Sequence, residues 1–177
     1  MAEERDLVVL FGGYGRRGDF GELGDELRRD DTLTVLECPQ PSDSLDWEGT
    51  IQDCMDEIER VAEPEDRIHL VGVSAGGAQA LALCTQRPEE FSSCTGLAAP
   101  NDARDFEDPT FRQKVRIWFA GDTVAEARAR LREQPEAFPA KFPQGVDPPR
   151  VYLAAARTDP IVPFRHHILL RSRLPVA

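Results

Sequence analysis

The stretch that decides the fold is residues 68–81, IHLVGVSAGGAQAL, in which an apolar run gives way to small residues. The apolar part predicts a β-strand over 68–73. The small residues from Ala75 to Cys84 predict a helix that Pro88 bounds. Between them lies a G-x-S-x-G motif centred on Ser74. The sequence therefore predicts a sharp turn from strand to helix with a serine at its apex.

The motif has a chemical interpretation. A serine hydroxyl becomes a nucleophile when a sharp turn thrusts it out of the sheet, within reach of a base. The residues two positions away on either side must then be glycine-sized, and Gly72 and Gly76 meet that need. The alternative is a glycine-rich turn without a catalytic role. The flanking strand and helix favour the nucleophile.

Outward from this turn, strand-like and helix-like segments alternate along the chain, which is typical of a parallel sheet with helices on both faces. The other expected strands are residues 7–11, 33–36, 94–100 and 151–156, and helical spacing is seen around 20–27 and 51–62. Thr50 and Asp53 resemble a capping box at the start of the second of these helices. A single α/β domain over 1–177 is predicted, a mostly parallel, doubly wound sheet of about five strands.

The connection over residues 101–149 is too long for a plain crossover and predicts a small helical lid inserted in the domain. It concentrates aromatic residues, namely Phe106, Phe111, Trp118, Phe119, Phe138 and Phe142. They suggest either an apolar acyl or alcohol pocket above Ser74 or a core for the lid's own helices. Both interpretations stay open at this point.

Residues 71–100 resemble the nucleophile-elbow segment of the α/β-hydrolase superfamily, and the loop Phe11-Gly12-Gly13-Tyr14-Gly15 resembles its first loop. The resemblance implies a strand order of second, first, third, fourth, fifth. It also implies that the backbone N–H groups of Gly13 and Ala75 form an oxyanion hole. Phe11 stands where the family usually has histidine. The alternative for this loop is a phosphate-binding turn, although its glycines do not complete G-x-G-x-x-G.

Residues 156–163, ARTDPIVP, resemble the acid turn of the same family. The resemblance implies that Asp159 holds a catalytic histidine in its correct tautomer. The alternative is that Asp159 only caps the turn before Pro160. Asp102 is a weaker candidate for the acid and is expected to open the lid instead.

The sequence contains three histidines, and none stands where the family has its catalytic base. His69 belongs to the strand that leads to Ser74 and is expected to point into packing. His166 and His167 fall on a predicted terminal helix and are expected to be surface residues beside Arg165 and Arg171, which makes them weak candidates for the base. The resemblance implies that the chain stops before the strand and loop that carry this histidine.

Composition narrows the class of protein. Twenty-one basic against 32 acidic side chains give a net charge of −11, which argues against nucleic acid or an anionic membrane as partner. No apolar run approaches the length of a membrane span, and the charged start is unlike a signal peptide, so a cytoplasmic protein is expected. Cys38, Cys54, Cys84 and Cys94 form no C-x-x-C pair and are expected to be free, half-buried thiols.

The combined expectation is a serine hydrolase that cleaves a small carboxylic ester or thioester through an acyl-Ser74 intermediate, without cofactor or metal. Two alternatives stay open: a non-catalytic binding protein on the same fold, or a fragment of a longer hydrolase. Residues 151–156 are uniformly apolar, which predicts a strand covered on both faces of the sheet. This strand would lie at an edge of the sheet, which predicts association between copies of the chain.

Overall fold

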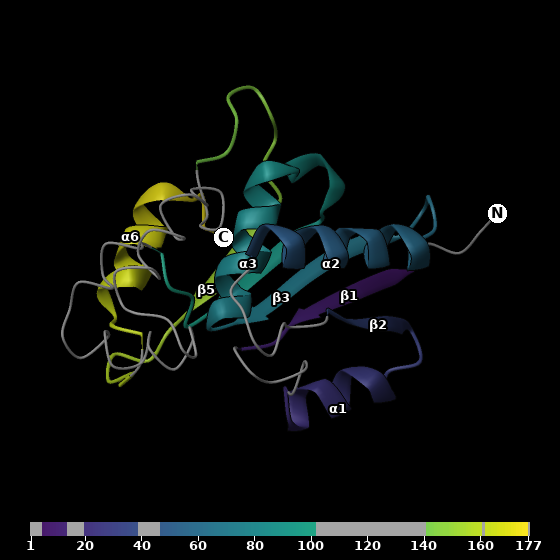
Figure 1. Cartoon of the computed structure of the whole chain (residues 1–177), viewed down its shortest axis with the longest axis horizontal. Helices are drawn as coiled ribbons and strands as arrows, with labels where there is room; N and C mark the ends of the chain where they lie inside the picture. The colour runs from purple at the N-terminus through teal and green to yellow at the C-terminus, as the bar shows by residue number, and fades with distance from the viewer. Residues whose placement is uncertain (1–4, 14–19, 39–46, 102–140, 161, 177) are drawn as a thin grey trace.

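The computed structural model describes residues 5–13, 20–38, 47–101, 141–160 and 162–176. In these ranges a parallel sheet of five strands forms the centre of the molecule, in the order β2-β1-β3-β4-β5 (Figure 1). The order expected from the sequence is confirmed. The strands are β1 (Asp6–Phe11), β2 (Leu33–Cys38), β3 (Arg67–Val73), β4 (Ser93–Leu97) and β5 (Arg150–Ala154).

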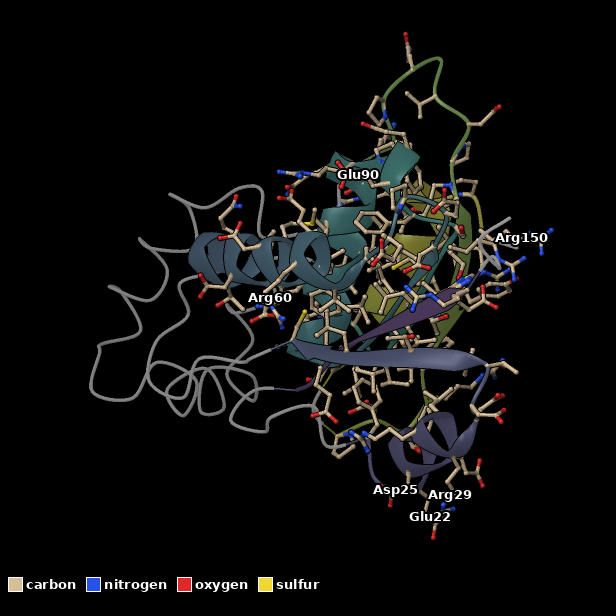
Figure 2. All side chains as sticks on the ribbon, turned by 90° about the vertical axis from the view of Figure 1, so that its right-hand side faces the viewer. Glu22, Asp25, Arg29, Arg60, Glu90 and Arg150 are labelled. Carbon is tan, nitrogen blue, oxygen red and sulfur yellow. The ribbon has the colours of Figure 1, made fainter. Side chains whose placement is uncertain are left out.

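Helices lie on both sides of the sheet. On one side are α2 (Trp47–Val61) and α3 (Ala75–Gln86), and on the other is α1 (Glu22–Arg29), as Figure 1 shows. A short 3₁₀ turn, η1 (Pro88–Glu90), follows α3, and α6 (Arg165–Arg173) packs beside β5. The charged side chains of Glu22, Asp25 and Arg29 are exposed on the outer side of α1 (Figure 2). This layering is what alternating strand and helix patterns predict.

The core lies between the sheet and the pair α2 and α3. Alternate residues of each strand point to this side because side chains alternate along a strand. They join buried residues of the helices in one apolar cluster, which includes Leu7, Val9, Phe11, Leu70, Cys94 and Val151 from the sheet and Met55, Ile58, Leu81, Leu83 and Leu170 from the helices. The glycine-rich turn after β3 is thereby anchored at both ends in packed structure.

The opposite face of the sheet is covered unevenly. Val8 and Leu10 on β1 are buried there, whereas Val71 on β3 is only half-buried and Tyr152 on β5 is 42% exposed. The expectation that residues 151–156 form a strand covered on both faces is therefore wrong. The strand is β5, and only its other face meets the core. Among the described residues, its far edge carries one parallel bridge, between Val151 and Val176.

Two further expectations need correction. α2 begins at Trp47, so Thr50 lies inside the helix, 5% exposed, and does not form a capping box with Asp53. Burial of Thr50 and Ile51 favours helix at these positions and outweighs the local capping signal. The four cysteines are free, as expected, but they are fully rather than half-buried because each belongs to the apolar cluster.

The predicted lid over 101–149 is described only at its ends, Asn101 and residues 141–149. Phe142 is half-buried and packs against the core. Asp102 and the other lid aromatics, Phe106, Phe111, Trp118, Phe119 and Phe138, lie outside the described residues. Within the described part of the chain, no helix combines the length and apolarity that crossing a bilayer requires.

Candidate active site

Ser74 stands on the turn between β3 and α3 in a conformation that L-amino acids rarely adopt. Its φ is 55° and its ψ is −123°. It occupies the position before the helix, where a serine side chain usually caps the first turn, yet its hydroxyl makes no such bond. A backbone bond from Ser74 N–H to the carbonyl of Leu97, 2.8 Å long, ties the turn to β4. Ser74 is half-buried, and its hydroxyl is not used to cap the helix, so it can interact with a bound molecule.

The two glycines of the motif make this turn possible. A Cβ on Gly72 would lie 2.2 Å from the carbonyl oxygen of Gly76, and a Cβ on Gly76 would lie 2.1 Å from the carbonyl oxygen of Phe11. Both contacts are with backbone atoms, which cannot move aside without breaking the sheet or the helix. Neither position therefore accommodates a side chain, and the strained conformation of Ser74 is held by its surroundings.

The loop after β1 meets this turn. A Cβ placed on Gly13 would lie 3.6 Å from the Cβ of Ser74, so the two residues are in contact range. Ala75 is the first residue of α3, and the N–H groups of a first helical turn have no partner within the helix. The structure thus brings together Gly13, Ser74 and Ala75, three residues that the sequence places in two separate segments.

Asp159 lies in the turn after β5. Its Oδ1 accepts a hydrogen bond from Val162 N–H over 2.9 Å, and its own N–H donates to the carbonyl of Ala156 over 3.2 Å. This carboxylate closes its own turn, as the capping alternative expects. β4 separates β5 from β3, so the ends of these two strands are about 10 Å apart at the usual strand spacing. Asp159 and Ser74 both follow the carboxyl ends of their strands, so they lie at the same end of the parallel sheet.

His69 lies near the other end of β3. Its Nε2 is 3.0 Å from Asp6 Oδ1 and its Nδ1 is 2.8 Å from Ser93 Oγ. The expectation that it points into packing is wrong, because it faces the half-open side of the sheet. Ser74 is five positions further along the chain, which amounts to about 16 Å of extended strand. His69 therefore cannot act on Ser74.

His166 is fully buried, so the expectation of a surface histidine is wrong at this position. It lies in the first turn of α6, and its Nδ1 accepts a hydrogen bond from Asn101 N–H over 2.9 Å. A neutral imidazole has one lone pair for accepting a proton, and in His166 the backbone of Asn101 occupies it. In this arrangement His166 is not set to take the proton of a serine.

His167, its neighbour, is half-buried and stacks on Phe164 with ring centroids 5.1 Å apart. Burial, and then the positive charge of Arg171, hold the pKa of His167 below its usual value. This residue is neutral near pH 7 and keeps an accepting nitrogen. Among the residues that the structure describes, neither His167 nor any other histidine forms a hydrogen bond with Ser74.

Sequence reasoning missed two features. Asn101 is 1% exposed and joins α6 to the end of β4 through His166 and through Arg173, whose Nη1 lies 3.4 Å from Asn101 Oδ1. The grouping of His69 with Asp6 and Ser93 unites three neighbouring strands. The only signal in the sequence was the placement of polar residues in otherwise apolar strands.

Over the described ranges, no three metal-binding side chains lie close enough to hold an ion.

A parallel sheet in this order, with a serine on a strained turn at the carboxyl end of its central strand, defines the α/β-hydrolase class of folds. Residues 39–167 match the family model described as alpha/beta hydrolase fold, and the chain belongs to this family. The resemblance inferred from the sequence is confirmed.

Solved structures agree on the fold. Acylaminoacyl peptidase from Pyrococcus horikoshii superposes with a TM-score of 0.68 and 14% identity over 97% of this chain and 31% of that one. A monoacylglycerol lipase from Paleococcus ferrophilus superposes with a TM-score of 0.59 and 17% sequence identity, over 96% of this chain and 80% of the lipase. Mouse alpha/beta hydrolase domain-containing protein 10 superposes with a TM-score of 0.64 and 19% sequence identity, over 96% of this chain and 76% of the mouse protein.

The chain spans about a quarter to a third of the length of the peptidases among these neighbours, 26% for a prolyl endopeptidase and 30% for an acylaminoacyl peptidase. A search of the curated proteins found no match. At these identities the neighbours establish the fold, and the chemistry has to be argued from the residues themselves.

Proposed function

We propose that the protein is a serine hydrolase that cleaves a carboxylic ester or thioester through an acyl-Ser74 intermediate. The observation that carries this proposal is the conformation of Ser74, a strained serine whose hydroxyl does not cap its own helix. Backbone strain at a polar residue is typical of functional sites, because the rest of the structure must be built to hold it. The family and its lipase and peptidase neighbours support a hydrolytic reaction.

In the proposed reaction, Ser74 Oγ attacks the carbonyl carbon of the substrate and the oxygen of that carbonyl becomes an oxyanion. The N–H groups of Gly13 and Ala75 are the donors that stabilise it. Gly13 lies in contact range of Ser74 and Ala75 opens α3, so both donors are already beside the hydroxyl before the charge develops. Asp159 is proposed to orient the general base, which none of the described histidines supplies.

A fluorophosphonate probe tests the nucleophile. We expect the probe to modify Ser74 in the wild-type chain and to modify nothing at that position in Ser74→Ala. Ser172→Ala is the matched control, because Ser172 is exposed on α6, donates only to the carbonyl of Leu169, and takes no part in the site. A wild-type chain whose adducts all map to residues other than Ser74, and whose modification is unchanged in Ser74→Ala, would contradict the assignment.

A second function is favoured by one observation: the ring nitrogen of His166 that faces Asn101 is engaged, and no described histidine contacts Ser74. This second function is that of a binding protein, which would hold a ligand beside Ser74 without turning it over. A folded wild-type chain that the probe leaves unmodified at Ser74 would favour this function over hydrolysis.

A further inference from the structure

The polar group formed by Asp6, His69 and Ser93 lies at the amino-terminal edge of the sheet, far from Ser74. Its hydrogen bonds form a chain: Asp6 Oδ1 is 3.0 Å from His69 Nε2, and His69 Nδ1 is 2.8 Å from Ser93 Oγ. The three residues come from the neighbouring strands β1, β3 and β4. Register explains the contact, because Asp6 is paired with Arg67, and His69 with Ser93.

The direction of these bonds follows from the charge of Asp6. Burial pushes the pKa of this carboxyl upward, but the hydrogen bonds from His69 and Arg67 outweigh it and hold the pKa below its usual value. Asp6 is therefore ionised near pH 7 and can only accept, so His69 Nε2 carries the proton. In the neutral imidazole Nδ1 then has the lone pair, and the hydroxyl of Ser93 donates to it.

Arg67 fixes the carboxylate from its other side. Its Nε and Nη2 donate to the two oxygens of Asp6 over 2.8 and 3.0 Å. A carboxylate held by two such bonds is rigid, and it fixes the orientation and the tautomer of the imidazole. An acid, an imidazole and a serine in this order are the components of an activated hydroxyl, which is recognised by geometry and not by position in the chain.

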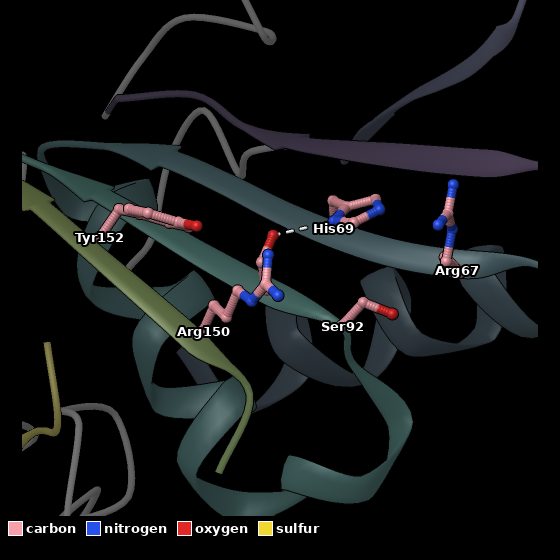
Figure 3. A pocket seen from close by; sticks show the side chains of 6 residues that line it. Arg67, His69, Ser92, Arg150 and Tyr152 are labelled. Atoms are coloured by element: carbon pink, nitrogen blue, oxygen red, sulfur yellow. Dashed lines mark hydrogen bonds between the residues drawn. The ribbon is translucent and has the colours of Figure 1, made fainter. Parts of the chain in front are cut away.

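The group opens onto a cavity of about 440 Å³ lined by Arg67, His69, Ser92, Ser93, Arg150 and Tyr152 (Figure 3). Arg150 is the strand neighbour of Ser93 across β4 and β5. Its guanidinium forms no ion pair or hydrogen bond with any described residue, and it provides positive charge beside the serine. Small organic molecules fit a space of this size.

We propose that Ser93 is a second nucleophile, with His69 as its general base and Asp6 as the residue that positions the imidazole, and that it takes an acyl group from a small carboxylic ester. Ser93 Oγ bonds to the carbonyl carbon while its proton passes to His69 Nδ1. The bond to the leaving oxygen then breaks, and His69 returns the proton to the departing alcohol. Water repeats the sequence on the acyl-serine, which releases the acid and restores Ser93.

Arg150 is placed to stabilise the oxyanion of this reaction, because a guanidinium in a partly enclosed cavity acts more strongly on a developing charge than it would in water. This site does not rest on the proposed role of Ser74. The two serines lie at opposite edges of the sheet, and an adduct on one is distinguishable from an adduct on the other by peptide sequencing.

The test is acetylation of the full chain by 4-nitrophenyl acetate in a Ser74→Ala background, with the modified residue located by mass spectrometry. We expect an acetyl group on Ser93, its loss in Ser93→Ala, and at least about a 100-fold slower acetylation in His69→Gln, the usual range for removal of a general base. Ser172→Ala is the matched control, since Ser172 is an exposed serine on α6 that does not line the cavity. It should acetylate at the unaltered rate.

The positioning role of Asp6 has its own readout. Asp6→Glu should recover part of the rate lost in Asp6→Asn, whereas a purely structural role would leave the two variants equal once their melting temperatures match. Thermal unfolding of each variant shows that it is folded. Absence of acetyl on Ser93 in a folded Ser74→Ala protein would overturn the proposal, and so would equal losses in Ser172→Ala and Ser93→Ala.

Discussion

The backbone N–H of Asn101 donates a hydrogen bond to Nδ1 of His166 over 2.9 Å, although the two residues lie 65 positions apart. This bond fastens the first turn of α6 to the chain that leaves β4. Both residues are buried, so neither can replace the bond with one to water. It also decides which nitrogen of His166 carries the proton, and so it removes this histidine from direct catalysis on Ser74.

We predict that His166→Leu destabilises the protein by about 2 kcal/mol, because it leaves the buried N–H of Asn101 without an acceptor. The free energy of unfolding, measured by urea titration, gives the effect. His167→Leu is the matched control on the same turn, and it should change stability by less than about half as much. Equal losses in the two variants would contradict the role given to the bond.

The turn at Ser74 should be intolerant of any side chain at its flanking glycines. Gly72→Ala and Gly76→Ala force a Cβ to within about 2 Å of backbone oxygens. We expect each to cost at least about 3 kcal/mol or to prevent folding. Gly13→Ala is the control, because its Cβ would meet Ser74 at an ordinary 3.6 Å. Thermal unfolding of the three variants should separate Gly13→Ala clearly from the other two.

Acid should weaken the link between the chain's start and β3. A hydrogen bond from Glu63 N–H holds the pKa of Asp66 below its usual value, against the opposing effect of burial and with help from Arg5. A carboxyl with a lowered pKa contributes stability above its unfolded pKa of 3.8 and loses it as pH falls through its folded value.

The stability difference between wild type and Asp66→Asn should therefore be largest at pH 6 and shrink below about pH 4. Urea unfolding at a series of pH values measures it. Asp31→Asn, at an exposed carboxylate, should show a small difference at every pH. A gap for Asp66→Asn that stays constant down to pH 2.5 would contradict the prediction.

The four thiols should be unreactive in the folded protein. The neighbouring Cys54 thiol and burial raise the pKa of Cys38, and burial together with the Cys84 thiol raises that of Cys94. Since the thiolate is the reactive form, all four cysteines should resist Ellman's reagent at pH 8 and react once guanidinium unfolds the chain. Rapid reaction of even one thiol under native conditions would show that the core between α2, α3 and the sheet opens readily.

The outer edge of β5 remains a predicted site of association between copies. One bridge at Val176 covers its start, and the exposed Tyr152 and Ala154 follow. Light scattering at increasing protein concentration should show growth in mass, and Tyr152→Lys should reduce it, because a charge on an edge strand opposes pairing. A monomer at every concentration, with slow amide exchange at Leu153, would show that the edge is already covered.

Local patterns in the sequence were enough to predict the order of strands and helices and the turn at Ser74. Apolar runs and small-residue helices are local patterns, and a G-x-S-x-G motif restricts its own backbone, since Gly72 and Gly76 admit no side chain. The resemblance carried by residues 71–100 added the sheet order, which is confirmed. Lengths were less well predicted: α2 begins at Trp47, earlier than its capping signal suggested.

Tertiary structure alone decided which polar residues meet. His166 is buried instead of exposed because α6 docks against Asn101, and no local pattern reports where a helix docks. His69 meets Asp6 and Ser93 because strand register aligns them, and register is a property of three segments taken together. Hydrogen bonds between distant residues depend on how whole elements pack. For that reason the group of Asp6, His69 and Ser93 at the amino-terminal edge of the sheet could be recognised only in the folded chain.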